Sequence, residues 1–171
     1  MDKVYKNRYQ ELYINNENRL IIDSAPGIVT LISTVGGILL IEHERMNTIS
    51  LETVRGYIED GEDPKDAAIR EAHEELGIDE DSIININQLG KVNPENSYTN
   101  QAVYCFSMQL DYKGSIDEAK LQKEEGILSV KWYPREDIPG MILDGKINDG
   151  ITISAFAFQF AGFLDNGGRR K

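Results

Sequence analysis

Alternating apolar and polar residues predict that the chain begins with β-structure. Residues 9–14 and 20–22 flank a polar turn at residues 15–18, a pattern typical of a hairpin. A second, more apolar hairpin is predicted from residues 28–32 and 38–41, which flank two consecutive glycines, and we expect it nearer the core. Further strands are predicted at residues 50–54, 83–92, 99–110 and 126–133.

Two segments follow the helical period instead. In residues 63–77, Asp63 suits the N-cap, Pro64 the first helical position and Gly77 a left-handed C-terminal cap. One arc of this helix is apolar and is expected to face the core: Ala68, Ile69, Ala72 and Leu76. The opposite arc carries three glutamates, Glu71, Glu74 and Glu75. A terminal helix is expected to begin at Asn148 or Asp149 and to end near Leu164.

Strands combined with two packed helices predict an α/β (α+β) fold, with a mixed sheet in an α/β/α layer arrangement. The length of 171 residues fits one main domain. We divide the chain into an N-terminal β extension at residues 1–25, a main domain at residues 26–164 and a flexible tail at residues 165–171.

The net charge of the chain argues against one class of binding partner. The chain has 18 Lys and Arg against 29 Asp and Glu, a formal net charge of −11. Proteins that coat nucleic acids bind phosphates through Lys and Arg, so this balance argues against nucleic acid as a partner. An acidic chain remains well suited to sites that hold cations.

Membrane and export signals are not expected. The longest apolar stretches, residues 26–41 and 151–164, are shorter than the roughly 20 residues that a membrane-spanning helix needs. The polar start of the chain lacks the apolar run of a signal peptide. The single cysteine, Cys105, has no partner for an internal disulfide, so we expect a reducing, cytoplasmic setting.

The three helix glutamates favour a metal site. Like charges at helical spacing repel one another, and a cation between them removes that cost. Glu71 and Glu75 lie one turn apart, and Glu62 precedes the helix on a loop that can fold back toward them. Carboxylate oxygens without His or Cys at ligand spacing favour Mg²⁺ or Mn²⁺ over Zn²⁺, and Mg²⁺ commonly shares its shell with phosphates. A merely solvated acidic helix face is the alternative interpretation of these glutamates alone.

The wider spacing resembles a known motif. Gly56, five residues, Glu62, seven residues and then residues 70–78 match every position of the Nudix box, G-x5-E-x7-R-E-U-x-E-E-x-G-U with U apolar. On these residues the chain is identified as a member of the Nudix hydrolase family, which implies the Nudix-type α/β/α sandwich. Residues 51–56 and 144–152 resemble the ADP-ribose pyrophosphatase branch, although Val54 and Arg55 replace its usual proline and alanine.

The resemblance implies a hydrolase that needs Mg²⁺, with Mn²⁺ as the alternative, and cleaves the diphosphate linkage of a nucleoside diphosphate derivative, ADP-ribose or a related nucleotide sugar. Glu71 and Glu75 would be the main metal ligands, with Glu74 and Glu62 as further ligands or supporting acids. The backbone carbonyl of Arg55 would be an additional ligand. The N-terminal hairpin is similar to a sheet that builds a homodimer in relatives, so a second copy of the chain is an expected partner.

Other roles also follow from the resemblance. Arg70 and Glu74 would take part in catalysis, Arg70 chiefly by orienting a box carboxylate. Gly56 would permit close backbone approach, and Gly77 would end the helix. The general base is expected in an acidic loop, at Glu124 or Glu125.

The sequence says less about which residues bind the substrate than about the metal site. Tyr57, Tyr98 and Tyr104 are candidates to stack on adenine, against the alternative that they only pack. Glu52, in the segment before the box, is a further candidate to bind the substrate. Two other functions stay open: a nucleoside triphosphate or dinucleoside polyphosphate pyrophosphohydrolase, and a catalytically silent module that binds a nucleotide.

Overall fold

The computed structural model describes residues 1–45, 48–111, 116 and 126–168, and its main feature is a mixed sheet. The strands of this sheet are β4 (Gly27–Thr34), β5 (Gly37–Arg45), β6 (Thr48–Glu52), β7 (Val54–Tyr57), β8 (Ile83–Val92), β9 (Val103–Leu110) and β10 (Ile127–Tyr133). Their order is β10-β5-β4-β9-β8, while β6 pairs with β5 and β7 with β4. β4 and β9 run parallel and the other pairs antiparallel, so the predicted mixed sheet is confirmed.

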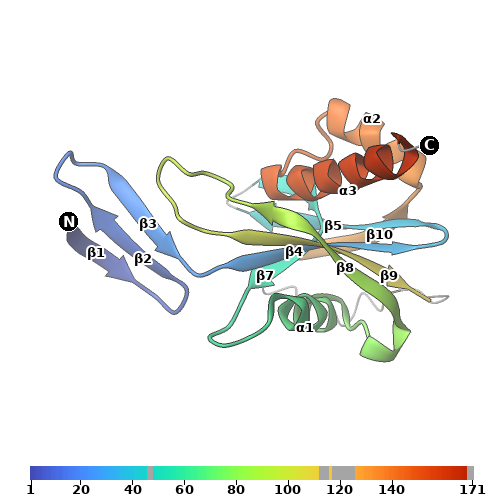
Figure 1. The fold of residues 1–171 in the computed structure, drawn as a ribbon, viewed down its shortest axis with the longest axis horizontal. Coiled ribbons are helices and arrows are strands. Elements are labelled where there is room, and N and C mark those ends of the chain that lie inside the picture. The colour runs from blue at the N-terminus through green and yellow to red at the C-terminus, as the bar shows by residue number, and fades with distance from the viewer. Residues whose placement is uncertain (46–47, 112–115, 117–125, 169–171) are drawn as a thin grey trace.

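Helices cover both faces of this sheet. Figure 1 shows α1 (Pro64–Leu76) beneath it, and α2 (Ile138–Leu143) and α3 (Gly150–Gly168) above it. The described residues also include two 3₁₀ turns, at Glu80–Ser82 and Arg135–Asp137. The predicted α/β/α sandwich is therefore confirmed.

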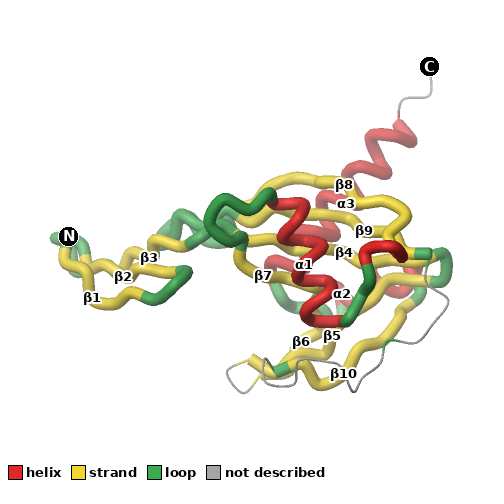
Figure 2. Tube along the Cα trace, turned by 90° about the horizontal axis from the view of Figure 1, so that it is seen from below, coloured by secondary structure: helices red, strands yellow, loops and turns green. Residues whose placement is uncertain are grey.

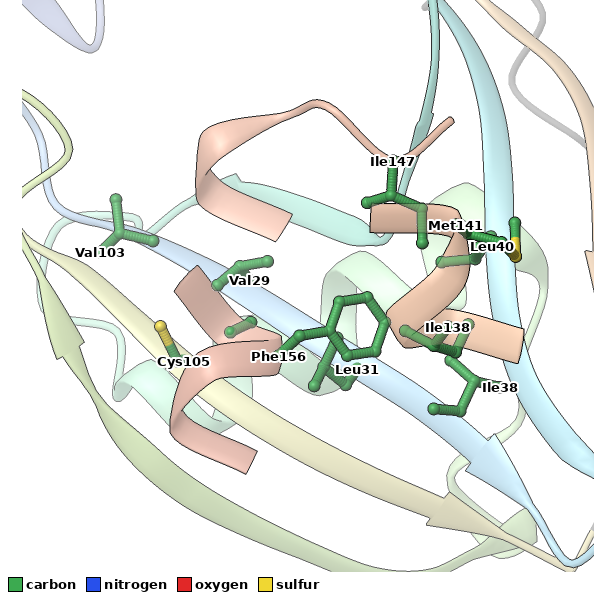
Figure 3. Close-up of a cluster of buried hydrophobic side chains, with 11 residues drawn as sticks. Val29, Leu31, Ile38, Leu40, Val103, Cys105, Ile138, Met141, Ile147 and Phe156 are labelled. Atoms are coloured by element: carbon green, nitrogen blue, oxygen red, sulfur yellow. The ribbon is translucent and has the colours of Figure 1, made fainter. Parts of the chain in front are cut away.

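The central strands are buried on both faces, which explains their almost continuous apolar sequence. Toward α2 and α3, alternate residues such as Val29, Leu31 and Leu40 pack around Phe156 (Figure 3). Toward α1, the intervening residues of the same strands pack in a second cluster: Ile32, Leu39 and Ile41 with Ala72 and Leu76. Phe156 is fully buried, so it fixes α3 against the sheet.

A separate sheet of three strands projects from the main domain (Figure 2). It consists of β1 (Asp2–Lys6), β2 (Gln10–Ile14) and β3 (Leu20–Ser24), and β2 and β3 form the predicted hairpin. We did not predict β1 because its residues are all exposed and show no alternation. Backbone and side-chain bonds tie β3 to the loop before β9: Ile22 N donates to Tyr98 O at 2.6 Å, and Ser24 N donates to Asn100 Oδ1 at 2.9 Å.

Besides β1, other elements differ from the sequence prediction. The strand predicted at residues 50–54 is two strands, β6 and β7, which pair with different neighbours. The short helix α2 was not predicted, since it contains Pro139 and Gly140 and spans only six residues. α3 continues to Gly168, past the predicted end near Leu164.

The predicted caps of α1 are confirmed. Asp63 Oδ1 accepts a bond from Lys65 N at 2.8 Å, and Pro64 opens the helix. Gly77 has a φ of 66°, and its N–H donates to His73 O at 2.7 Å. One prediction about this helix was wrong: Glu75, which we placed on the arc opposite the apolar one, is only 4% exposed. At 3.6 residues per turn it lies next to Ala68 around the helix axis, so it is buried with the apolar arc.

In the residues that the structure covers, no helix is long and apolar enough to cross a bilayer.

Candidate active site

A cavity of about 620 Å³ opens between α1, β7 and the three-stranded sheet. Its lining is rich in charge and contains four arginines and four glutamates: Arg8, Arg45, Arg55, Arg70, Glu59, Glu71, Glu74 and Glu75. The remaining lining residues are Tyr9, Gly27, Ile28, Gly56, Tyr57, Gln101, Val103 and Ile151. Half of the eight arginines in this acidic chain therefore line one cavity.

Arg70 is the centre of the charge network on the α1 side. Its guanidinium bonds both oxygens of Glu62, with Nε to Oε1 at 2.8 Å and Nη2 to Oε2 at 3.0 Å. Nη1 donates to Glu71 at 2.8 Å and to Glu74 at 3.0 Å, and Nη2 donates to the Tyr57 carbonyl at 2.9 Å. One guanidinium thus orients three box carboxylates, as predicted from its position in the motif.

The Glu62–Arg70 pair also shifts the pKa values of both side chains. Hydrogen bonding to Arg70, opposed in part by burial, holds the pKa of Glu62 below its ordinary value. The same bonds raise the pKa of Arg70, so the guanidinium stays charged. Glu62 does not line the cavity, because both of its oxygens face Arg70 and one also accepts a bond from Glu59 N at 2.8 Å.

Gly56 brings the backbone of β7 against the helix. A Cβ at this position would lie 1.9 Å from Glu71 Oε1, so a larger residue here would displace the Glu71 carboxylate. The predicted close contact at Gly56 is therefore present, and it is made with a box carboxylate.

A second charge network lies where β6 and β7 diverge. Glu52 is 2% exposed, and its Oε2 accepts a hydrogen bond from Arg45 Nε at 2.9 Å and forms an ion pair with Arg55 Nη2 at 3.0 Å. Arg55 Nη1 reaches Asp149 Oδ1 at 3.0 Å, while Asp149 Oδ2 accepts from Thr152 N at 2.8 Å. Asp149 is therefore the cap predicted for the terminal helix. Glu52 does not line the cavity but holds two arginines that do.

Aromatic rings from two sheets meet at the cavity. Tyr9 of the three-stranded sheet stacks on Tyr57 of β7, with ring centroids 4.5 Å apart and planes 5° apart. Beside them, Arg8 pairs with Glu59 at 2.7 Å. Two other candidate tyrosines do not line this cavity: Tyr98 is exposed on the loop before β9, and Tyr104 packs on β9 with the Lys91 amine 5.7 Å from its ring centre.

A comparison with known protein families matches residues 23–156 to the NUDIX domain. The chain belongs to the Nudix family. Its sequence is similar to an ADP-ribose pyrophosphatase of Haemophilus influenzae, with 28% identity over 103 residues, 60% of this chain and 46% of that protein. The match thus spans less than half of that relative's length.

Solved structures show the same fold. The chain is similar to a structure titled "Crystal structure of ADP compounds hydrolase", with a TM-score of 0.71 and 19% identity over 98% of this chain and 93% of that one. The structural similarity therefore extends over nearly the whole length of this chain, including the three-stranded sheet that precedes most of the NUDIX match.

Nudix hydrolases generally need divalent metal ions, so we asked whether these residues suit one. Glu71, Glu74 and Glu75 line the cavity from adjacent turns of α1 and offer the carboxylate oxygens that hard divalent cations prefer. Within residues 1–45, 48–111, 116 and 126–168, no group of three acidic, His or Cys side chains is arranged so that it could hold a metal ion. Arg70 instead holds Glu71 and Glu74. The carboxylates are therefore the right kind of ligand for a divalent ion, but in this structure the guanidinium sets their positions.

The proposed bases of the Nudix reaction, Glu124 and Glu125, lie outside the described residues. The residue that follows them, Gly126, accepts a bond from Glu44 N through its carbonyl at 2.8 Å. Glu44 precedes Arg45, which lines the cavity.

Several lining residues escaped the sequence analysis. Arg8 and Tyr9 lie almost 50 residues before the Nudix box, and Arg45 and Gln101 lie on other strands or loops. None belongs to a local motif, since only the folding of the sheets brings them to the box.

Proposed function

We propose that this Nudix chain is a metal-dependent hydrolase that cleaves the diphosphate linkage of a nucleoside diphosphate derivative, with ADP-ribose or a related nucleotide sugar as substrate. The observation that carries the proposal is the complete acidic box, oriented by Arg70, at the wall of a cavity that also presents arginines and stacked tyrosines. This combination suits a ligand with phosphates and an aromatic base.

Glu71 and Glu75 would hold the Mg²⁺ or Mn²⁺, with Glu74 and the backbone carbonyl of Arg55 as further ligands. A bound divalent ion neutralises charge on the phosphate oxygens and lowers the pKa of the attacking water. In this arrangement Arg70 positions carboxylates, and Glu62 fixes Arg70 through two bonds.

The reaction adds water across one P–O–P bridge. The water oxygen bonds to one phosphorus, the bridging oxygen leaves with the other phosphate, and ADP-ribose would give AMP and ribose 5-phosphate. Glu124 or Glu125 would accept the proton of the water. The bond between Glu44 and Gly126 supports this assignment, because it fixes the end of that loop close to the cavity.

Recognition would combine charge and stacking. Tyr9 and Tyr57 are too close for a third ring to enter between them, so a base would stack on an outer face of the pair. Arg8, Arg45 and Arg55 would offset the negative charge of the diphosphate.

We also propose that the chain forms a homodimer through its three-stranded sheet. This sheet exposes apolar side chains, namely Met1, Val4, Tyr5 and Leu20. Exposed apolar groups gathered on a small sheet are typical of an interaction surface. Light scattering coupled to size-exclusion chromatography would give twice the chain mass if this proposal holds, and the single-chain mass if it does not.

The deciding experiment is a hydrolysis panel with Mg²⁺ or Mn²⁺, in which products are separated by ion-exchange chromatography. ADP-ribose, ADP-glucose, NADH, diadenosine polyphosphates and nucleoside triphosphates would be compared, each with an EDTA control. AMP release from the nucleotide sugars is the expected result. Preferred cleavage of triphosphates or diadenosine polyphosphates would favour the other pyrophosphohydrolase class, and binding without cleavage would favour the silent module.

A further inference from the structure

The cavity lies on both sides of strand β7. Gly56 faces α1, because a Cβ there would collide with the Glu71 carboxylate. Successive residues of a strand point to opposite faces, so Arg55 and Tyr57 face the other side. Accordingly, Arg55 pairs with Asp149 at the start of α3. The backbone of β7 therefore separates Arg55 and Tyr57 from the box glutamates.

Arg55 is held in one orientation. Its two terminal nitrogens bond two different carboxylates, Glu52 and Asp149, each at 3.0 Å. Ser50 Oγ fixes Glu52 from one side at 2.6 Å, and Thr152 N fixes Asp149 at 2.8 Å. Because these supports are themselves bonded, the guanidinium is oriented before any ligand arrives, which reduces the entropy lost on binding.

Arg55 retains capacity to donate. A guanidinium carries five N–H groups, and within the described residues two of those on Arg55 are used by carboxylates. Its side chain is 19% exposed and lines the cavity. The remaining N–H groups suit the oxygens of a phosphate, the anion whose geometry an arginine fork matches.

The neighbour of Arg55 on this face suggests where such a phosphate would lie. Arg55 and Tyr57 are two residues apart on one strand, so their α-carbons are separated by about 7 Å. In the proposed function a base stacks on the Tyr9–Tyr57 pair, and we take the attached ribose to lie toward Arg55, which lines the same cavity. In other nucleotide sites, an arginine near the ribose accommodates a 2′-phosphate.

We propose that Arg55 recognises a phosphate on the nucleoside ribose, outside the scissile diphosphate. The substrate class is then a nucleoside diphosphate derivative that is phosphorylated on its ribose hydroxyl. This inference rests on the proposed function, since it takes the base to stack on the tyrosine pair. It makes Arg55 a specificity-determining residue in addition to its backbone role in the box.

The test measures binding without chemistry. Dissociation constants for AMP, adenosine 2′,5′-bisphosphate and adenosine 3′,5′-bisphosphate would be determined by calorimetry in EDTA. We expect the native protein to bind one bisphosphate at least about tenfold more tightly than AMP, the gain typical of a charge-assisted bond. Arg55→Ala should bind all three ligands with similar affinity, and Arg55→Lys should keep part of the preference.

Arg19→Ala is the matched control, because Arg19 lies in the exposed turn between β2 and β3 and outside the cavity. Equal affinities of the native protein for the three ligands would overturn the inference. An unchanged preference in Arg55→Ala would do the same, as would an equal loss of affinity for AMP and the bisphosphates, which would place Arg55 on the shared 5′-phosphate. Hydrolysis of the substrate panel is measured separately, so failure of the proposed function is distinguishable from failure of this inference.

Discussion

The guanidinium of Arg70 holds both carboxylate oxygens of Glu62, at 2.8 and 3.0 Å, in the two-pronged geometry that only arginine offers. Glu62 lies on the loop before α1, and Arg70 lies in the second turn of that helix. The pair closes the loop onto the helix and leaves Nη1 to orient Glu71 and Glu74. The spacing of eight residues between Glu62 and Arg70 therefore allows the loop to fold back onto the helix.

Replacement of Arg70 by lysine should reduce turnover about 10- to 100-fold, the usual effect of losing a residue that orients metal ligands. A lysine keeps the charge but has a single nitrogen, so it cannot bond Glu62 twice and reach Glu71 as well. Steady-state kinetics with saturating Mg²⁺ would measure the loss. Arg135→Lys, outside the cavity, is the control and should behave as the native protein.

The Glu62–Arg70 pair should make stability depend on pH in the acid range. The Arg70 guanidinium lowers the pKa of Glu62 below its ordinary value of 4.5. A lowered folded-state pKa contributes stability that is present above the unfolded value and is lost as the pH falls through the folded value. The native protein should therefore unfold at a higher temperature than Glu62→Gln near neutral pH, and the gap should shrink below pH 4.5. Thermal unfolding followed by circular dichroism tests this, and a gap that persists unchanged to about pH 3 would contradict it.

Glu75→Gln should abolish Mg²⁺-dependent turnover, with a loss on the order of a thousandfold or more if this carboxylate is a main metal ligand. The substitution keeps the size of the buried side chain, so the fold should persist. Kinetics and circular dichroism would be measured together. Asp66→Asn removes an exposed acid from the same helix outside the cavity and should leave turnover unchanged. Native activity in Glu75→Gln would refute the metal assignment.

Gly56→Ala should impair both stability and activity. The new methyl group would overlap the Glu71 carboxylate, so this side chain must swing away and give up its bond with Arg70, typically at a cost of about 1–3 kcal/mol. We expect turnover to fall at least tenfold, because the shift displaces a proposed metal ligand. Gly36→Ala is the matched control, since a Cβ there makes only an ordinary contact of 3.7 Å with Thr34 Oγ1. Denaturant unfolding and kinetics of the two variants would separate the effects.

Glu124→Gln and Glu125→Gln test the general base. Loss of the base should lower kcat about 100- to 10,000-fold at saturating metal in one of the two variants. Glu136→Gln, an exposed acid outside the cavity, should keep native kcat. If both loop variants turn over like the native protein, the base lies elsewhere.

Local sequence determined the elements and the motif. Asp63, Pro64 and Gly77 cap α1 through their own backbone and side-chain chemistry, so neighbouring residues suffice to predict that helix. The box residues lie within 23 positions of the chain, and their resemblance to the Nudix motif implied that Arg70 would orient a carboxylate.

Only the tertiary structure showed which distant residues contact one another, because the periodicity of the sequence holds no such information. The Tyr9–Tyr57 stack joins the turn between β1 and β2 to β7, and the ion pairs of Glu52 with Arg45 and Arg55 join residues from three separate strands. Contacts between side chains that are far apart in the sequence form only when the chain folds and brings them within bonding distance. Local sequence patterns therefore cannot reveal them.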